Sequence, residues 1–211
     1  MNTDSVADGG PQAGTPGSVH AQAPRLKPLP ESEMSAAQLK AARELASGPR
    51  GSFNPNGPNA ALLRSPALME RTQKVGEYLR YDSSIPPRLN EFAILITARQ
   101  WGAQIEWSAH HPLALKAGLD PAVAADLAQG RRPAGMKDDE AMVYRFCKEL
   151  HDNKEVSDAA YQAVVEKFGE RGVMDLIGVT GYYTLLALVL NVTRVALPDG
   201  APPPLPALKQ S

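Results

Sequence analysis

The most apolar stretch of the chain runs from residue 176 to residue 197 and reads LIGVTGYYTLLALVLNVTRVAL. Its length approaches the roughly 20 apolar residues that a helix needs to cross a bilayer. However, Asp175 borders the stretch. Polar residues also interrupt it at Thr180, Thr184, Asn191, Thr193 and Arg194. We therefore predict a helix that is buried in the core or in a subunit interface, and not a membrane span.

Proline, glycine and capping residues divide the rest of the chain into helices. The segment Met34 to Ala46 stops at Gly48-Pro49, Ser65-Pro66 opens ALMERTQKVGEYLRY, and Pro86-Pro87 opens RLNEFAILITARQW. Further helices are expected up to Gly118, from Pro121 to Ala128, from Asp138 to about His151, from Ser157 to Phe168 and from Val173 to Leu197. No stretch alternates apolar and polar residues as a strand does. The pattern predicts an all-α fold of about seven or eight helices.

Both ends of the chain differ in composition from its centre. Residues 1–30 are rich in Gly, Pro, Ala, Ser and Gln, and residues 199–211 are rich in Pro. Such segments bury too little apolar surface to offset the entropy of ordering them. We expect a flexible N-terminal arm, a single all-α domain over residues 31–198 and a flexible tail over residues 199–211.

Charge and cysteine content exclude several classes of protein. Lys and Arg total 22 and Asp and Glu total 23, so no global basic field exists to attract nucleic acid or an anionic membrane. Cys147 is the only cysteine, which excludes an internal disulfide and a thiol cluster for zinc or iron–sulfur. The N-terminus lacks the apolar run of an export signal. These features favour the cytoplasm.

An acid and a histidine in the segment GAQIEWSAHHPLA, residues 102–114, form the first candidate site. Glu106 and His110 are separated by one helical turn, so the carboxylate can hydrogen-bond and orient the imidazole. That contact would make His110 a proton donor, whereas His111 points about 100° away around the helix. The alternative is an ordinary surface pair. A metal site is not expected, because adjacent histidines diverge on a helix and neither HExxH nor HxxxH occurs.

Two charged residues of the preceding helix complete this candidate site. Arg99 offers a planar fork for a carboxylate ligand, and Glu91 is embedded in the apolar run FAILI. At about 100° per residue, both fall in one quadrant with Glu106 and His110. A buried structural pair of Glu91 with Arg99 is the competing interpretation. Trp107 could line the site, although core packing is the more common role of a tryptophan.

Two segments resemble the carboxymuconolactone decarboxylase family, which also contains the alkylhydroperoxidase-D-like proteins. They are NEFAILITARQWGAQIEWSAHHPLALKAGL and GVTGYYTLLALVLNVTRVALP, and the likeness extends over roughly residues 60–198. Redox-active relatives carry Cys-x-x-Cys-x-x-x-His with an upstream glutamate. When the histidine is placed at His110, the thiols fall at Ala103 and Glu106 and the glutamate at Glu91. The chain therefore resembles the decarboxylase-like branch, which lacks both cysteines.

The resemblance implies a cofactor-free lyase that acts on a carboxylated γ-lactone or a related small organic acid, as in the degradation of aromatic compounds. In that reading His110 donates a proton, Glu106 orients it, Glu91 is an auxiliary acid or base and Arg99 binds the anionic substrate. The remaining substrate-binding candidates are Trp107, Tyr182, Tyr183 and Asn191. The resemblance also implies a homo-oligomer, either a trimer or a hexamer, and no metal or organic cofactor.

Two other functions remain open from the sequence. One is a non-catalytic, oligomeric family member that binds a small apolar or acidic metabolite. The other is a peroxide or thiol oxidoreductase that works through Cys147, which is disfavoured because the thiol that should resolve the oxidised product is missing.

Overall fold

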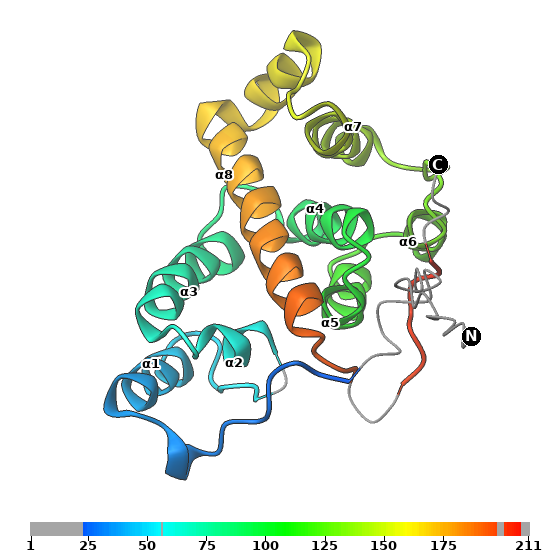
Figure 1. Ribbon diagram of the computed structural model, residues 1–211. Helices are drawn as coiled ribbons and strands as arrows, with labels where there is room; N and C mark the ends of the chain where they lie inside the picture. The colour runs from blue at the N-terminus through cyan, green and yellow to red at the C-terminus, as the bar shows by residue number, and fades with distance from the viewer. Residues whose placement is uncertain (1–22, 56, 198–200, 208–211) are drawn as a thin grey trace, which may run out of the picture.

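In the computed structural model, residues 23–55, 57–197 and 201–207 are described, and their regular secondary structure is entirely helical (Figure 1). A short 3-10 turn, η2 (Glu31–Glu33), precedes the first α-helix. The eight α-helices of this part of the chain are α1 (Ala36–Ser47), α2 (Pro58–Leu62), α3 (Pro66–Tyr81), α4 (Pro87–Gln100), α5 (Gln104–Lys116), α6 (Pro121–Ala128), α7 (Asp138–Asn153) and α8 (Asp158–Thr193). The predicted all-α class with seven or eight helices is confirmed.

Local chemistry explains most of the helix boundaries. Ser35 and Gln38 form a capping box at the start of α1, and Asp120 accepts a hydrogen bond from the backbone N–H of Ala122 at 2.7 Å at the start of α6. Helices α2, α3, α4 and α6 each begin with a proline, whose missing N–H costs nothing in the first turn. The sequence did not predict α2, because five residues are too few to show a helical period.

Helix α8 joins the last two predicted helices and ends at Thr193, four residues before the predicted end at Leu197. Its backbone is non-helical at Gly169, where φ is 66° and ψ is −179°, so the element bends between its two parts. This conformation lies in a region that essentially only glycine adopts. The two predicted segments are thus correct in type, and they are joined directly instead of through a loop.

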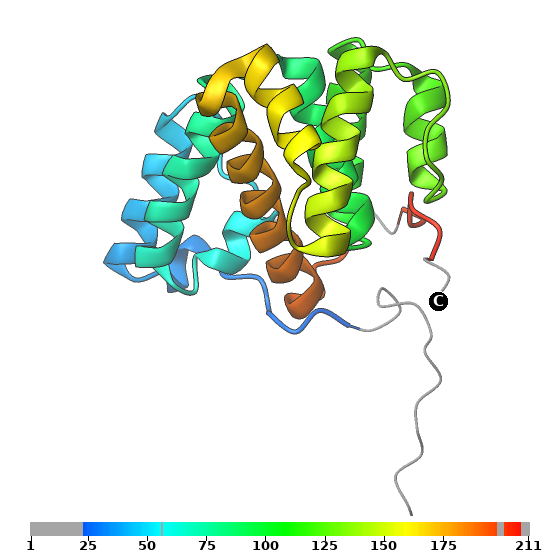
Figure 2. The same cartoon turned by 90° about the horizontal axis from the view of Figure 1, so that it is seen from above.

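Helix α8 lies at the centre of the protein. It packs against α2 and α3 on one side and against α4 and α7 on the other (Figures 1 and 2). Among the described residues, α8 is long and apolar enough to cross a membrane by length and composition, and 56% of its most apolar 18-residue window is buried inside the structure. Its partner α4 is buried along nearly its whole length, through Leu89, Phe92, Ala93, Ile94, Leu95, Ile96 and Ala98.

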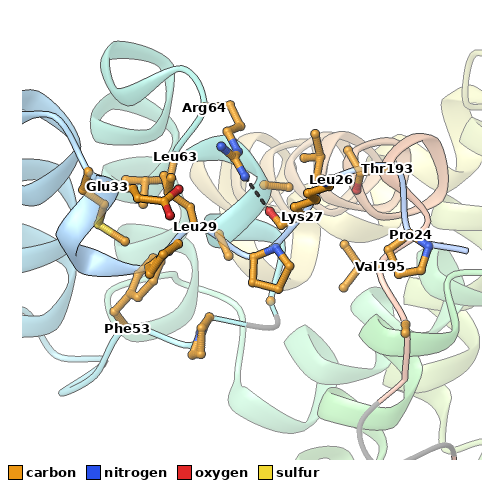
Figure 3. Close-up of a pocket in the computed structure, with 18 of the residues that line it drawn as sticks. Pro24, Leu26, Lys27, Leu29, Glu33, Phe53, Leu63, Arg64, Thr193 and Val195 are labelled. Carbon is orange, nitrogen blue, oxygen red and sulfur yellow. Dashed lines mark hydrogen bonds between the residues drawn. The ribbon is translucent and has the colours of Figure 1, made fainter.

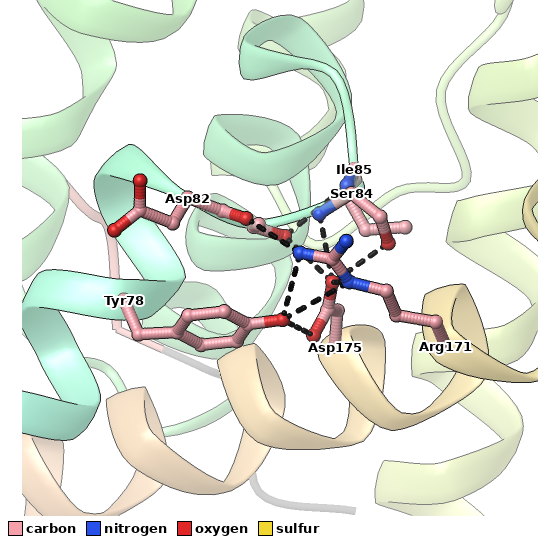
Figure 4. A network of polar contacts seen from close by, with 7 residues as sticks. Tyr78, Asp82, Ser84, Ile85, Arg171 and Asp175 are labelled. Atoms are coloured by element: carbon pink, nitrogen blue, oxygen red, sulfur yellow. Dashed lines mark hydrogen bonds and ion pairs between the residues drawn. The ribbon is translucent and has the colours of Figure 1, made fainter.

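A polar network anchors α8 to the end of α3, and Asp175 is its centre (Figure 4). The Tyr78 hydroxyl donates to this carboxylate at 2.8 Å, and the Ser84 backbone N–H and hydroxyl donate at 2.7 and 2.6 Å. The Arg171 guanidinium lies 3.8 Å away. Burial acts to raise the pKa of Asp175, but the hydrogen bonds from Ser84 and Tyr78 outweigh it and the net pKa is lowered. The network keeps a buried acid charged inside an apolar helix.

Part of the proline-rich tail packs on the domain. The Gln104 side chain and the Leu205 backbone exchange two hydrogen bonds, of 2.9 and 2.8 Å, and Leu205 is only 2% exposed. Residues 201–207 of the predicted flexible tail thus contact the domain through backbone hydrogen bonds and one buried leucine. The predicted flexibility of residues 199–200 and 208–211 lies outside the described residues.

The described part of the N-terminal arm follows the surface near the end of α8. The Arg25 backbone N–H donates to the Thr193 carbonyl at 2.9 Å, its guanidinium donates to the Val192 carbonyl at 3.0 Å, and Leu29 packs against the core. These contacts satisfy carbonyls at a helix end that have no partner within the helix. Residues 1–22, for which flexibility was also predicted, are outside the described residues.

Candidate active site

The connection between α4 and α5 places two distant parts of the sequence face to face. Gly102 adopts φ of +58°, and the Ala103 N–H donates to the Ala98 carbonyl at 2.8 Å, so the chain reverses within three residues. The two helices therefore run side by side. As a result Glu91, near the start of α4, reaches His110 on α5, although 19 positions separate them.

The His110 imidazole lies between two carboxylates. Its Nδ1 is 2.6 Å from Glu91 Oε2, and its Nε2 is 3.7 Å from Glu106 Oε2. The first distance is a short hydrogen bond, whereas the second is an ion-pair distance too long for one. A carboxylate can only accept here, so in the pairing of a carboxylate with the imidazole the donor is the Nδ1–H of His110. All three side chains are sheltered, with exposed fractions of 7% for His110, 12% for Glu91 and 4% for Glu106.

This arrangement exchanges the expected roles of the two acids. Glu106 was predicted to orient His110 through the one-turn spacing within α5. In the structure, Glu91 of the neighbouring helix makes the closer contact. A hydrogen bond at Nδ1 sets the orientation of the ring and leaves Nε2 for other chemistry.

Burial changes the ionisation of Glu106. Desolvation raises the pKa of its carboxyl group, and the nearby Glu91 adds to this, while His110, Arg50 and Arg80 act in the opposite direction. The net pKa is raised, so Glu106 keeps its proton to a higher pH than an exposed glutamate does. A protonated carboxyl group next to the free edge of an imidazole is suited to proton transfer.

Two tyrosines of α8 cover the imidazole. The Tyr183 ring meets His110 edge-on, with 4.9 Å between ring centroids, and Tyr182 packs perpendicular to Tyr183 at 5.3 Å. Burial is the largest cause that raises the pKa of both phenols, and for Tyr183 the rise is large. Both side chains therefore remain neutral hydrogen-bond donors beside His110, Glu91 and Glu106.

The other predicted substrate-binding residues have structural partners. Arg99 Nη1 donates to the Pro206 carbonyl at 2.6 Å, and Asn191 donates to the Trp101 carbonyl at 2.8 Å. Trp107 is 3% exposed and stacks on His111, with 5.7 Å between the ring centroids. The structure thus brings together Glu91, Glu106, His110, Tyr182 and Tyr183. It gives Arg99, Asn191 and Trp107 contacts that hold the fold.

Residues that the sequence did not single out also lie beside this site. Arg50, in the loop after α1, and Arg80, in α3, both act on the charge of Glu106. Gly76 of α3 lies directly under the Tyr182 hydroxyl. Only Gly76 left a signal in the sequence, because a glycine inside a helix costs about 1 kcal/mol relative to alanine and often marks a close approach.

The remaining reactive group, Cys147, is poorly suited to redox chemistry. It is fully buried in α7, where its sulfur lies 3.8 Å from the Thr180 hydroxyl. Burial raises the pKa of its thiol to about 12, so the reactive thiolate is scarce at neutral pH. Within the described residues, no group of three or more His, Cys, Asp and Glu side chains is arranged to hold a metal ion.

A separate cavity of about 900 Å³ lies between the N-terminal segment and the chain at the end of α8 (Figure 3). It is enclosed by the N-terminal segment, α2 and the chain just after α8, and its lining is mainly apolar. Residues labelled in Figure 3 include Leu26, Leu29, Phe53, Leu63 and Val195, with Lys27, Glu33 and Arg64 among them. None of the residues around His110 lines this cavity.

Comparison of the sequence with models of protein families and with curated proteins gives no match for this chain. The functional argument therefore depends on the geometry of the site.

Proposed function

We propose that this chain is a cofactor-free carboxy-lyase of the decarboxylase-like branch of the carboxymuconolactone decarboxylase family, acting on a carboxylated γ-lactone or a related small organic acid. The observation that carries this proposal is the buried His110 with a carboxylate at each ring nitrogen. A histidine held at one nitrogen, with a proton-sharing acid at the other, can deliver a proton to carbon.

The reaction requires no group beyond the lactone and a proton source. In an unsaturated lactone, the bond to the carboxyl group breaks and carbon dioxide leaves. The electron pair passes through the ring double bond toward the lactone carbonyl, and a ring carbon then accepts one proton. The net change is the loss of carbon dioxide from a carboxylate and the gain of one proton, which water later replaces on the enzyme.

The geometry assigns a role to each of the three groups. Glu91 holds Nδ1 of His110 and keeps the ring in one orientation. Glu106, with its raised pKa, lies 3.7 Å from Nε2, so a substrate beside both groups can take a proton from either of them. Tyr182 and Tyr183 exclude water and offer neutral donors to the charge that develops on the lactone.

The test is a panel of unsaturated γ-lactones carrying isotope-labelled carboxyl groups, scored for release of labelled carbon dioxide. On a lactone that the wild-type protein converts, His110→Ala and Glu106→Gln should each lower turnover by about 10²–10⁴-fold. His111→Gln is the matched control, because that neighbouring histidine stacks on Trp107 instead. Full turnover in His110→Ala, or no release by the wild-type protein from any lactone, would contradict the proposal.

A second candidate function is the binding of a small apolar metabolite without chemistry. The apolar cavity of about 900 Å³ favours it, because its volume is in the range of known ligand pockets. A ligand that raises the unfolding temperature and is recovered unchanged would support this function. Turnover of that ligand would exclude it. Peroxide chemistry through Cys147 has no comparable support, given the burial and the raised pKa of its thiol.

We also propose that the protein is a cytoplasmic homo-oligomer, either a trimer or a hexamer. Exposed apolar side chains on α3 and α8 support the assembly, and surfaces of this kind are commonly covered by another subunit. They include Leu68, Val75, Met174, Ile177, Leu188 and Val192. Sedimentation equilibrium measures the mass directly, and a monomer at all concentrations would contradict this part of the proposal.

A further inference from the structure

Three buried polar atoms beside the catalytic candidates lack a hydrogen-bond partner among the described residues. They are Nε and Nη2 of Arg50 and the hydroxyl of Tyr182. The guanidinium lies close enough to the phenol oxygen to act on the pKa of Tyr182, a contact that leaves the Tyr182 O–H free to donate. Each such group destabilises the fold when it is left unpaired away from water. Native proteins leave few of them, and those that occur call for an explanation.

The unpaired atoms lie together over one point of α3. A Cβ atom built on Gly76 would overlap the Tyr182 hydroxyl and would lie 2.7 Å from Arg50 Nη2. Only a residue without a side chain allows the guanidinium and the phenol to approach α3 at this point. The cost of a glycine inside a helix is therefore offset by the space that it leaves for the two donors.

The donors have the geometry of a carboxylate site. The Nε and Nη2 hydrogens of an arginine point the same way and form a fork that matches the two oxygens of a carboxylate. The neutral Tyr182 hydroxyl adds a third donor. Burial strengthens such charge-assisted bonds, because the surrounding dielectric constant is lower than that of water.

This group of donors is next to the proposed reaction centre. Tyr182 packs on Tyr183, which packs on His110, and the charge of Arg50 acts on Glu106. A ligand held by Arg50 would thus extend toward the imidazole. In Arg99, the residue first expected to bind an anion, Nε is also buried without a partner, but Nη1 donates to the Pro206 carbonyl, so this guanidinium is tied to the C-terminal segment.

We infer that Arg50, Tyr182 and Gly76 form a carboxylate-binding subsite that anchors the substrate beside His110. This inference rests on the proposed function, because it names the group that holds the substrate of that same site. The anchored carboxylate is one that the reaction retains, since a salt bridge to the departing group would stabilise the ground state more than the transition state.

The experiment measures binding of a compound that cannot react. The probe is (5-oxotetrahydrofuran-2-yl)acetate, a saturated γ-lactone that carries its carboxylate on a side chain and not on the ring carbon that would lose carbon dioxide. Its primary amide is the uncharged control. By calorimetry, the wild-type protein should bind the carboxylate at least about 10-fold more tightly than the amide.

Variants test each part of the subsite. Arg50→Gln should weaken binding of the carboxylate by about 10- to 100-fold, and Tyr182→Phe by about 3- to 10-fold. Gly76→Ala should weaken it as Arg50→Gln does, because the added methyl group displaces both donors. Arg50→Lys, which keeps the charge without the fork, should bind more weakly than wild type. Arg43→Gln is the matched control, since that arginine side chain is 75% exposed.

The outcomes separate the subsite from the lyase activity. If His110→Ala binds the probe as wild type does and Arg50→Gln does not, the subsite stands even without carbon dioxide release. If carbon dioxide release continues in Arg50→Gln with an unchanged KM, the subsite is overturned and the lyase proposal stands. No binding by wild type, equal binding of the amide, or loss of binding in Arg99→Gln alone would each overturn the inference. Circular dichroism of every variant verifies the fold.

Discussion

Asp175 and Glu106 are buried to the same extent, with 4% of each residue exposed, and yet their environments are opposite. The Asp175 carboxylate accepts hydrogen bonds from Tyr78 and twice from Ser84, and its pKa is lowered. The Glu106 carboxylate has His110 Nε2 at 3.7 Å, and its pKa is raised. The equal exposed fractions therefore do not fix the pKa: desolvation of the Glu106 carboxyl group raises its pKa, whereas the donors around Asp175 outweigh the effect of burial there and lower its pKa.

The two acids represent two kinds of environment in one protein: Asp175 has a structural role, and Glu106 is placed for reaction. Donors that fully satisfy a carboxylate hold it in its ionised form and join two helices. A carboxylate with few donors keeps a proton at a higher pH and can exchange it. The unpaired atoms of Arg50 and Tyr182 belong to the reactive region around Glu106.

The largest expected effect is on the satisfied acid. Asp175→Asn should lower the free energy of unfolding by about 3 kcal/mol, because the amide places a donor against the donors of Ser84 and removes the favoured charge. Urea denaturation followed by circular dichroism measures this. Asp152→Asn, at an exposed ion pair with Lys148, should change stability by less than about 0.5 kcal/mol. Equal losses of stability in Asp175→Asn and Asp152→Asn would contradict the structural role given to Asp175.

The next effect is a loss of stability in acid through His151. Burial, followed by the charge of Lys148, lowers the pKa of this histidine from 6.5 to about 4. The unfolded chain therefore binds a proton at a higher pH than the folded protein, so the stability present above pH 6.5 is lost as pH falls toward 4. We expect a loss of about 2 kcal/mol in this range.

His151→Gln should flatten that part of the stability profile, measured by urea denaturation at a series of pH values. The lowered pKa of Asp175 adds a further loss only below its ordinary value of 3.8, so the two groups act in different ranges of pH. An unchanged slope between pH 6.5 and 4 in the variant would show that His151 is not the group responsible.

A smaller effect, with the opposite sign, is expected at Glu106. Its raised pKa means that the folded state favours the protonated form, so stability is greatest below its ordinary pKa of 4.5 and falls as pH rises through the raised value. Glu106→Gln should therefore leave the free energy of unfolding at neutral pH unchanged or raise it by up to about 1 kcal/mol. A loss as large as that of Asp175→Asn would place Glu106 in the structural group.

The smallest effect concerns Cys147, which belongs with the structural residues. Because its thiol is buried and has a pKa of about 12, a disulfide reagent should label it only after urea unfolds the protein. Cys147→Ser should leave any peroxide consumption unchanged. Rapid labelling of the folded protein would show that the Cys147 thiol is accessible and reactive, and would contradict this prediction.

Much of the architecture and part of the site could be predicted before the structure. Ser65-Pro66, Pro86-Pro87 and Asp120-Pro121 marked three helix starts correctly, since caps and first-turn prolines act within a few residues. The pairing of Glu106 with His110 was also accessible, because it depends on the helical period alone.

The partners of Arg99 show where this reasoning stops. Its position around the helix predicted a place beside His110, but the Pro206 carbonyl, 107 positions away, takes Nη1 of its guanidinium. The angle between residues on one helix says nothing about which other segment will pack there. The same reason hid Arg50, which no sequence pattern singled out.

Sequence patterns were thus sufficient for the helical class, most helix starts and the contact of Glu106 with His110, because all of these depend on neighbours within about one turn of helix. The short bond from Glu91 to His110, the convergence of Arg50 and Tyr182 over Gly76 and the placement of Leu205 required the packed molecule. Those contacts join residues that are distant along the chain. Their formation depends on how whole helices pack, which no local pattern encodes.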